Sequence, residues 1–248
     1  MRPPADRPAA KAVNDGFDPV TATLNYPAKT MHHPSGHACP PRAPATGPTT
    51  AVVVFDFDGT LTERDTILPF LRAAAGDGPF LRGLPALLPA LLTRGLGLLG
   101  RTATKERLFA RYLSGRPLDE VRAAGLRFAH DRLPGMLRPA ALRRLEWHRA
   151  EGHRCLVVTA SPELYVAPWA AARGIEAIGS RLAVDAAGRL TGRHDGPPCE
   201  GPEKLRRLQA LVGPDARILH AYGDSCGDAA LLRAAEHAHW RQFPAAAP

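Results

Sequence analysis

Two kinds of hydrophobic pattern alternate along the chain, and they predict where its strands and helices lie. The stretch AVVVF at 51–55 is a short, uninterrupted apolar run, which is typical of a strand buried on both faces in a parallel sheet. Similar runs occur in HRCLVVTAS at 153–161 and in ARILHAYGDS at 216–225. Each run ends in a polar segment. The pattern therefore predicts three strands of one sheet.

The region between the first two strands has a helical pattern. Over residues 66–147, leucine and alanine recur at three- and four-residue spacings, and glycine and proline divide the region into several segments. No strand-like alternation interrupts it. We therefore expect one helical insert of about 80 residues, a size that a small module can have.

Helices and strands alternate after the second strand. RLAVDAAGRLTG at 181–192 predicts a hairpin that turns at Ala187 and Gly188, whereas EKLRRLQALV at 203–212 and DAALLRAAEH at 228–237 predict helices. This order predicts an α/β fold, with a Rossmann-like parallel-sheet core and a helical cap inserted after the first strand. We expect a leader over 1–48, a core over 49–65 and 148–243, and a cap over 66–147.

Composition limits the function classes that remain. The 248 residues are 45% hydrophobic and carry a formal charge of +8, which favours anionic partners. Aromatic residues make up only 6%, so an aromatic and basic nucleic-acid surface is not expected. Arginine and proline interrupt the longest apolar stretch, 80–100, and we expect no membrane span.

The N-terminal segment and the cysteines bear on the setting of the protein. Residues 1–48 hold ten of the 25 prolines without periodicity, which predicts a disordered leader. The first residues lack the apolar centre of a secretory signal. The four cysteines form no CxxC pair and no metal-ligand spacing. These features favour a reduced, cytoplasmic location.

Polar side chains gather where the predicted strands end. Ligands bind at the carboxyl ends of strands in open α/β sheets, and a lysine opens the helix that precedes the last of these strands. The residues concerned are Asp56, Asp58, Thr159, Lys204, Asp224 and Asp228. Taken singly, Asp228 is typical of a helix cap, Thr159 of a turn and Lys204 of a solvated helix position.

Together these segments resemble a known family. DFDGTLT, LVVTAS, the Lys204 of GPEKL and GDSCGD are similar, in this order, to the four motifs of the haloacid dehalogenase (HAD) superfamily. The resemblance covers residues 51–243, and the helical insert resembles the cap of the phosphoserine phosphatase-like branch, subfamily IB. It implies a phosphatase that hydrolyses phosphomonoesters with Mg²⁺ through an aspartyl-phosphate.

The resemblance assigns roles to the acids. Asp56 would be the nucleophile, since a carboxylate can attack phosphorus and divide one slow hydrolysis into two steps. Asp58 would act as the general acid and base. Dehalogenases of the superfamily lack an acid there and transport ATPases carry threonine, so Asp58 favours net hydrolysis. The Mg²⁺ ligands implied are Asp56, Asp224 and the Asp58 backbone carbonyl, with Asp228 supporting them.

The same motifs indicate a phosphate-binding set. A glycine after the acids permits close approach of the backbone to the phosphate, and a threonine hydroxyl, backbone N–H groups and a fixed positive charge bind phosphate oxygens. The residues are Gly59, Thr60, Thr159, Ala160 and Lys204.

Substrate choice is expected to lie in the cap. Asp65 aligns with an acid that contacts the substrate's amino group in phosphoserine phosphatases, and Lys105 and Arg107 are candidates to bind a carboxylate or a second phosphate. The apolar stretch 80–100 is either ordinary core or a face that rests on a bilayer and admits a lipid phosphate. With CEGPEKL at 199–205, it resembles the phosphatidylglycerophosphatase C-like branch.

Three readings of the function follow. The first is a phosphatase of a small or lipid-linked phosphate ester, with peripheral contact at the inner face of the membrane in the lipid case. The second is a phosphoserine phosphatase of amino-acid biosynthesis. The third, a non-catalytic phosphate-binding regulator, requires damage to the acids or to Lys204, and the sequence has none.

Overall fold

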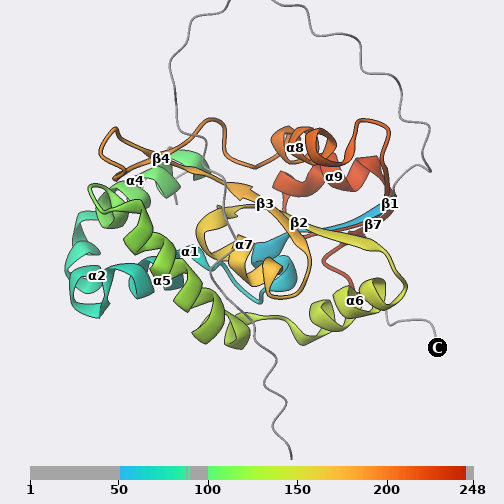
Figure 1. Ribbon diagram of the computed structural model, residues 1–248, viewed down its shortest axis with the longest axis horizontal. Coiled ribbons are helices and arrows are strands. Elements are labelled where there is room, and N and C mark those ends of the chain that lie inside the picture. The colour runs from blue at the N-terminus through green and yellow to red at the C-terminus, as the bar shows by residue number, and fades with distance from the viewer. Residues whose placement is uncertain (1–50, 88, 90–99, 244–248) are drawn as a thin grey trace, which may run out of the picture. The chain divides into compact units, whose positions relative to one another are not determined.

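The computed structural model describes residues 51–87, 89 and 100–243 (Figure 1). The expected leader over 1–48 and most of the apolar stretch after Leu87 lie outside the described residues. None of the helices in the described part is long and apolar enough to cross a bilayer.

A parallel sheet forms the core, as the sequence predicted, and it has five strands. Its order is β3-β2-β1-β6-β7. The strands are β1 (Ala51–Phe55), β2 (Arg154–Pro162), β3 (Glu176–Ser180), β6 (Arg217–Gly223) and β7 (Ala235–Trp240). Because β1 is central and Val54 pairs with both Leu156 and Ala221, the carboxyl ends of β1, β2 and β6 meet at one edge.

Two strands of this sheet were not predicted. The helix expected over 228–237 was wrong at its C-terminal end: α9 spans Ala229–Ala234, and the following residues pair with β6 as β7. Alanine and glutamate favour a helix locally, but pairing at the sheet edge overrides this preference. The short β3, EAIGS, contains Gly179, which weakens its strand signal.

Helices cover both faces of the sheet (Figure 1). On one face, α8 (Pro202–Val212) and α9 pack against Val52 and Val54 of β1. On the other face lies α6 (Pro139–Ala150), whose His148 meets the ring of Phe55 edge-on. The helix α7 (Glu163–Ala171) packs against β2 and β3.

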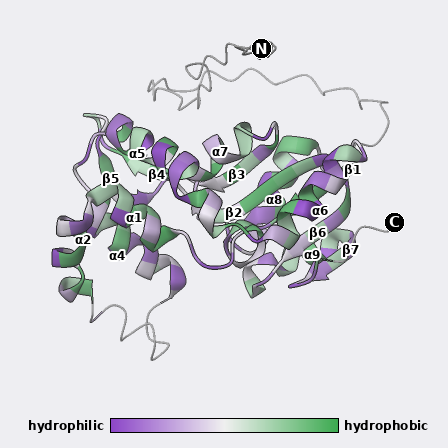
Figure 2. Ribbon diagram, turned by 90° about the horizontal axis from the view of Figure 1, so that it is seen from below, coloured by the Kyte–Doolittle hydropathy of each residue, from purple (hydrophilic) through white to green (hydrophobic). Residues whose placement is uncertain are grey.

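The cap is helical, as expected. Its described elements are α1 (Ile67–Ala75), α2 (Asp77–Gly83), η2 (Pro85–Leu87), α4 (Arg101–Leu113), α5 (Leu118–Asp131) and η3 (Leu133–Met136). Figure 2 shows α1, α2, α4 and α5 gathered beside the sheet and its own helices. The domain boundaries stay a prediction; α6, which spans the expected cap–core boundary, packs against β2.

The predicted hairpin is confirmed, and it packs against the cap helix α4. β4 (Leu182–Val184) and β5 (Leu190–His194) pair antiparallel, and Gly188 in the turn has φ of 72°. β5 packs against α4. A Cβ at Gly192 would lie 2.4 Å from Ala110 Cα, so only glycine permits this approach of strand and helix.

Candidate active site

The carboxyl edge of the sheet bounds a cavity of about 280 Å³. Asp56 follows β1, Thr159 lies near the end of β2, and Asp224 follows β6; all three line the cavity. The backbone N–H of Asp56 donates to the carbonyl of Tyr222 at 2.9 Å, which ties the end of β1 to β6. The cap forms part of the wall through α4 and the segment before α1.

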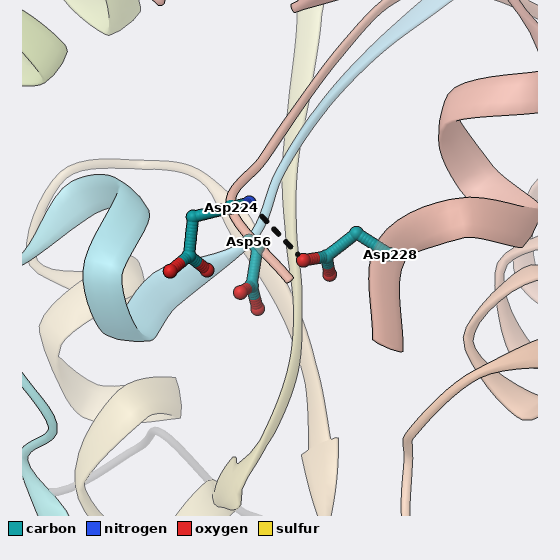
Figure 3. Close-up of side chains that lie close together, drawn as sticks. All are labelled: Asp56, Asp224 and Asp228. Carbon is teal, nitrogen blue, oxygen red and sulfur yellow. Dashed lines mark hydrogen bonds between the residues drawn. The ribbon is translucent and has the colours of Figure 1, made fainter. Parts of the chain in front are cut away.

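Three carboxylates converge at this edge. Asp56, Asp224 and Asp228 each offer an oxygen, and these oxygens lie within 4.8 Å of one another (Figure 3). Asp228 Oδ2 accepts the backbone N–H groups of Asp224 at 3.2 Å and Ser225 at 3.0 Å, and the Ser225 hydroxyl at 3.0 Å. Asp228 therefore shapes the loop that carries Asp224.

Lys204 compensates the negative charge of two of these acids. Its ammonium donates to Asp56 Oδ1 at 2.6 Å and to Asp228 Oδ1 at 2.5 Å, and its side chain is only 2% exposed. Burial lowers the pKa of Lys204, but the two carboxylates outweigh burial and raise it overall. Lys204 is thus a fixed cation at the site.

Burial disfavours the ionised form of Asp56. It raises the pKa of Asp56 to about 7, while the charge of Lys204 opposes this rise and that of Asp228 adds to it. A further cation beside Asp56 would act in the same direction as Lys204 and favour the carboxylate, the nucleophilic form.

The donor set fits a hard divalent cation. The half-buried carboxylate of Asp224 accepts no hydrogen bond and forms no ion pair within the part of the chain that the structure describes. Burial and the charge of Asp228 raise its pKa. Uncompensated carboxylate oxygens beside Asp56 are the ligands that Mg²⁺ prefers.

Asp58 lies two residues beyond Asp56 in a different environment. Oδ1 accepts the Thr66 backbone N–H at 2.9 Å and the Thr66 hydroxyl at 2.6 Å, and Oδ2 accepts the Ser161 hydroxyl. The Tyr165 hydroxyl lies 2.8 Å from that of Thr66. Burial raises the pKa of Asp58 to about 6 despite these hydrogen bonds. A carboxyl group with this pKa can exchange protons near neutrality.

Sequence reasoning did not single out Thr66, Ser161 and Tyr165 for this role. The only signal was Ser161 inside LVVTAS, since Thr66 and Tyr165 lie outside the motifs and reach Asp58 only through the fold.

The turn after β1, η1 (Phe57–Leu61), requires a glycine for a specific reason. Gly59 has φ of 77°, and a Cβ there would lie 2.3 Å from Asp224 Oδ2. Thr60 is buried, with no hydrogen-bond partner for its hydroxyl among the described residues. Thr62 holds the turn instead, accepting from Gly59 N–H at 3.3 Å and donating to the Arg64 carbonyl at 2.8 Å.

The remaining predicted residues differ in whether they line the cavity. Thr159 and Ala160 line the cavity, as do Asp65 and Lys105 from the cap side. Arg107 is exposed and is not among the lining residues. Arg101, one helical turn before Lys105, does line the cavity; its spacing of four residues from Lys105 was the signal available in the sequence.

The parallel sheet and this site of acids and one lysine define a class of hydrolases. The family model described as haloacid dehalogenase-like hydrolase matches residues 53–233, and the chain belongs to this family. The chain is 38% identical over 196 residues to Protein CicA of Caulobacter vibrioides, covering 77% of this chain and 86% of that protein.

Solved structures share the fold. A protein of unknown function from Bordetella pertussis Tohama I has a TM-score of 0.62 and 27% identity, covering 75% of this chain and 87% of that one. A HAD family hydrolase from Salmonella enterica serovar Typhi has a TM-score of 0.54 and 20% identity, covering 76% and 60%. A probable phosphoserine phosphatase from Vibrio cholerae has a TM-score of 0.54 and 17% identity, covering 75% and 54%.

Proposed function

We propose that the chain is a Mg²⁺-dependent phosphomonoester hydrolase that transfers the phosphoryl group to Asp56 and then to water. The observation that carries this proposal is the position of Asp56, which lies against Lys204 on one side and the uncompensated carboxylate of Asp224 on the other. A phosphate dianion and an aspartate repel each other, so the reaction needs positive charge there.

The residues divide the first step between them. Lys204 occupies Asp56 Oδ1, so we assign the attack on phosphorus to Oδ2, the carboxylate oxygen that the lysine does not contact. As the new O–P bond forms, the ester O–P bond breaks, and Asp58 donates its proton to the departing oxygen. When bound, Mg²⁺ would offset the charge between nucleophile and phosphate.

The second step reuses Asp58. Its carboxylate now takes a proton from water as the water oxygen attacks phosphorus, which breaks the bond to Asp56 and releases inorganic phosphate. The hydrogen bonds from Thr66 and Ser161 hold Asp58 in one orientation for both proton transfers.

The test is the Asp56→Asn variant. We expect Mg²⁺-dependent phosphate release from p-nitrophenyl phosphate to fall by at least about a thousandfold, because an amide is a poor nucleophile. Asp119→Asn, at an exposed position of α5, is the matched control and should retain activity. Beryllofluoride should bind Asp56 of the wild type as a mimic of the aspartyl-phosphate, and a brief pulse of substrate should leave a phosphoryl group on the same residue. Turnover by Asp56→Asn above about 1% would exclude this covalent route.

The ester itself is proposed as small or lipid-linked. The apolar cap stretch that motivates the lipid branch lies largely outside the described residues, so a screen must decide. Several dozen phosphate esters should be tested with Mg²⁺, including micellar lysophospholipid and phosphatidylglycerophosphate analogues. Turnover of water-soluble esters alone would exclude the lipid branch.

Phosphoserine hydrolysis is the second candidate. Asp65 and Lys105, an acid and a base, both line the cavity and could match the two charges of a free amino acid. Phosphoserine should then be preferred over phosphoethanolamine, which lacks the carboxylate, and over 3-phosphoglycerate, which lacks the ammonium. A substrate preference without this double dependence would exclude it.

A further inference from the structure

The cap helix α4 contributes two cations to the cavity wall. Arg101 and Lys105 both line the cavity from α4, and they stand one helical turn apart on the same face of that helix. Like charges at this spacing repel each other, so the pair does not stabilise the isolated helix.

Neither cation is firmly bound by the protein. Arg101 Nε lies 3.6 Å from Glu200 Oε1, and its side chain is 47% exposed. Lys105 Nζ reaches only the Ala160 carbonyl, at 3.5 Å, and has no carboxylate partner in the described ranges. Lys204, in contrast, holds two carboxylates at 2.6 Å or less. The α4 cations are therefore available to a ligand.

Their position relates them to the leaving group of the ester. Ala160 belongs to the segment expected to bind phosphate, so the Lys105 ammonium lies beside the place of the transferred phosphate. Arg101 lies one turn away toward Glu200, which precedes α8 in the core. A group that meets both cations would lie along α4, toward Glu200, and would belong to the part of the substrate that departs.

We infer that Arg101 and Lys105 bind a second anionic group of the substrate, and that this group replaces Glu200 as the partner of Arg101. The inference rests on the proposed function and narrows its substrate class to phosphomonoesters with a carboxylate, phosphate or phosphodiester in the leaving group. The segment before α1 adds two acids and one further cation to the lining, Glu63, Asp65 and Arg64, none of which lies on α4.

Two esters that share a carbon skeleton test the inference. 3-Phosphoglycerate carries a carboxylate where glycerol 3-phosphate carries a hydroxymethyl group. We expect the wild type to prefer 3-phosphoglycerate in kcat/KM by about 10- to 100-fold, the range of a charged hydrogen bond. Arg101→Gln and Lys105→Gln should each remove most of this preference through KM, while Lys105→Arg should retain it.

A substitution at Glu200 should have the opposite effect on kcat/KM. Glu200→Gln removes the competing carboxylate, so kcat/KM for 3-phosphoglycerate should rise while that for glycerol 3-phosphate changes less. Arg111→Gln, an exposed position of α4 outside the cavity lining, controls for lost charge and should leave the preference unchanged.

The outcomes separate the two proposals. Equal turnover of both esters, or an equal loss on both in Arg101→Gln, would overturn the second-anion site and leave the phosphatase proposal standing. If neither ester nor p-nitrophenyl phosphate released phosphate with Mg²⁺, the phosphatase proposal itself would fail.

Discussion

Two partly buried polar clusters lie along strand β6, and their polar groups are satisfied differently. At the carboxyl end of β6, Asp56, Asp224 and Asp228 lie close together, and Lys204 pairs with Asp56 and Asp228, so two of the three charges are matched. On the face covered by α6 lies a histidine cluster, which we define as His148, His153, His220, His239 and Tyr222.

The histidine cluster is satisfied by hydrogen bonds among its rings, by one from the Arg144 guanidinium and by ring stacking. The Tyr222 hydroxyl accepts from Arg144 Nε at 2.8 Å and lies 2.9 Å from His148 Nε2, and its ring stacks on that of His239 with centroids 4.3 Å apart. Burial lowers the pKa of His148 to about 3 and that of His220 to about 4. These imidazoles are therefore neutral at physiological pH.

The comparison distinguishes a reactive cluster from a structural one. At the carboxyl edge, the Asp224 carboxylate is left without a partner among the described residues. A bound cation or substrate can therefore complete this cluster. Within the histidine cluster, the hydrogen bonds pair the ring nitrogens of His148 with Tyr222 and His153. Both nitrogens of the buried His148 ring are therefore already engaged.

Removing the cation from the charged cluster should have the largest effect. Lys204→Met leaves Asp56 and Asp228 buried without their shared partner, which should lower the free energy of unfolding by about 3–5 kcal/mol. Phosphate release should fall at least a hundredfold, about the effect of losing one preorganised donor. Urea denaturation and a p-nitrophenyl phosphate assay measure the two effects.

A double variant shows whether charge is the cause. Lys204→Met with Asp228→Asn removes one uncompensated acid and should recover part of the stability but none of the activity. If Lys204→Met were as stable as the wild type, the interpretation of Lys204 as the compensating charge would be wrong.

The two clusters also differ in how well they could be predicted from the sequence. The charged cluster lies on three short motifs, and each motif occupies a strand end or helix start whose place the α/β pattern already determined. The histidine cluster has no motif. It forms only when α6, β6 and β7 pack together, and the first residues of β7 fall within the helix predicted over 228–237, because AAEH favours a helix locally.

A weak signal for the histidine cluster was present. His237 and His239 alternate along β7 as His220 and Tyr222 do along β6, and these residues pair directly, His220 with His237 and Tyr222 with His239. The cap wall was hard to predict for a related reason. Helical periodicity shows which residues share a face of α4, but only packing decides that Arg101 faces the cavity and Arg107 does not.

The next largest effect should come from lowering the pH, which should reduce the stability that the histidine cluster contributes. The unfolded chain protonates His148 near pH 6.5, whereas the folded chain keeps it neutral down to about pH 3. Within this window the unfolded state binds more protons, so the contribution of His148 to stability falls as the pH falls. Asp56 and Asp58, with raised pKa values, act in the opposite direction.

Comparing a His148 variant with the wild type separates the effect of His148 titration from that of these acids. His148→Phe keeps a ring beside Phe55 but cannot titrate. Relative to the wild type, its free energy of unfolding should improve by about 1.4 kcal/mol per pH unit as the pH falls from 6.5, or about 2 kcal/mol at pH 5. Urea denaturation of both proteins at each pH measures the difference. Parallel pH profiles would show that His148 titrates normally in the fold.

The smallest effect should come from a hydroxyl in the charged cluster. Ser225→Ala removes one of three donors to Asp228 Oδ2, and the backbone N–H groups of Asp224 and Ser225 remain. Since the main chain keeps the carboxylate satisfied, we expect a loss of only about 1 kcal/mol in urea denaturation at pH 7. A loss as large as that of Lys204→Met would mean that the serine hydroxyl, rather than the backbone and the lysine, holds Asp228. The charged cluster would then depend on side-chain hydrogen bonds as the histidine cluster does.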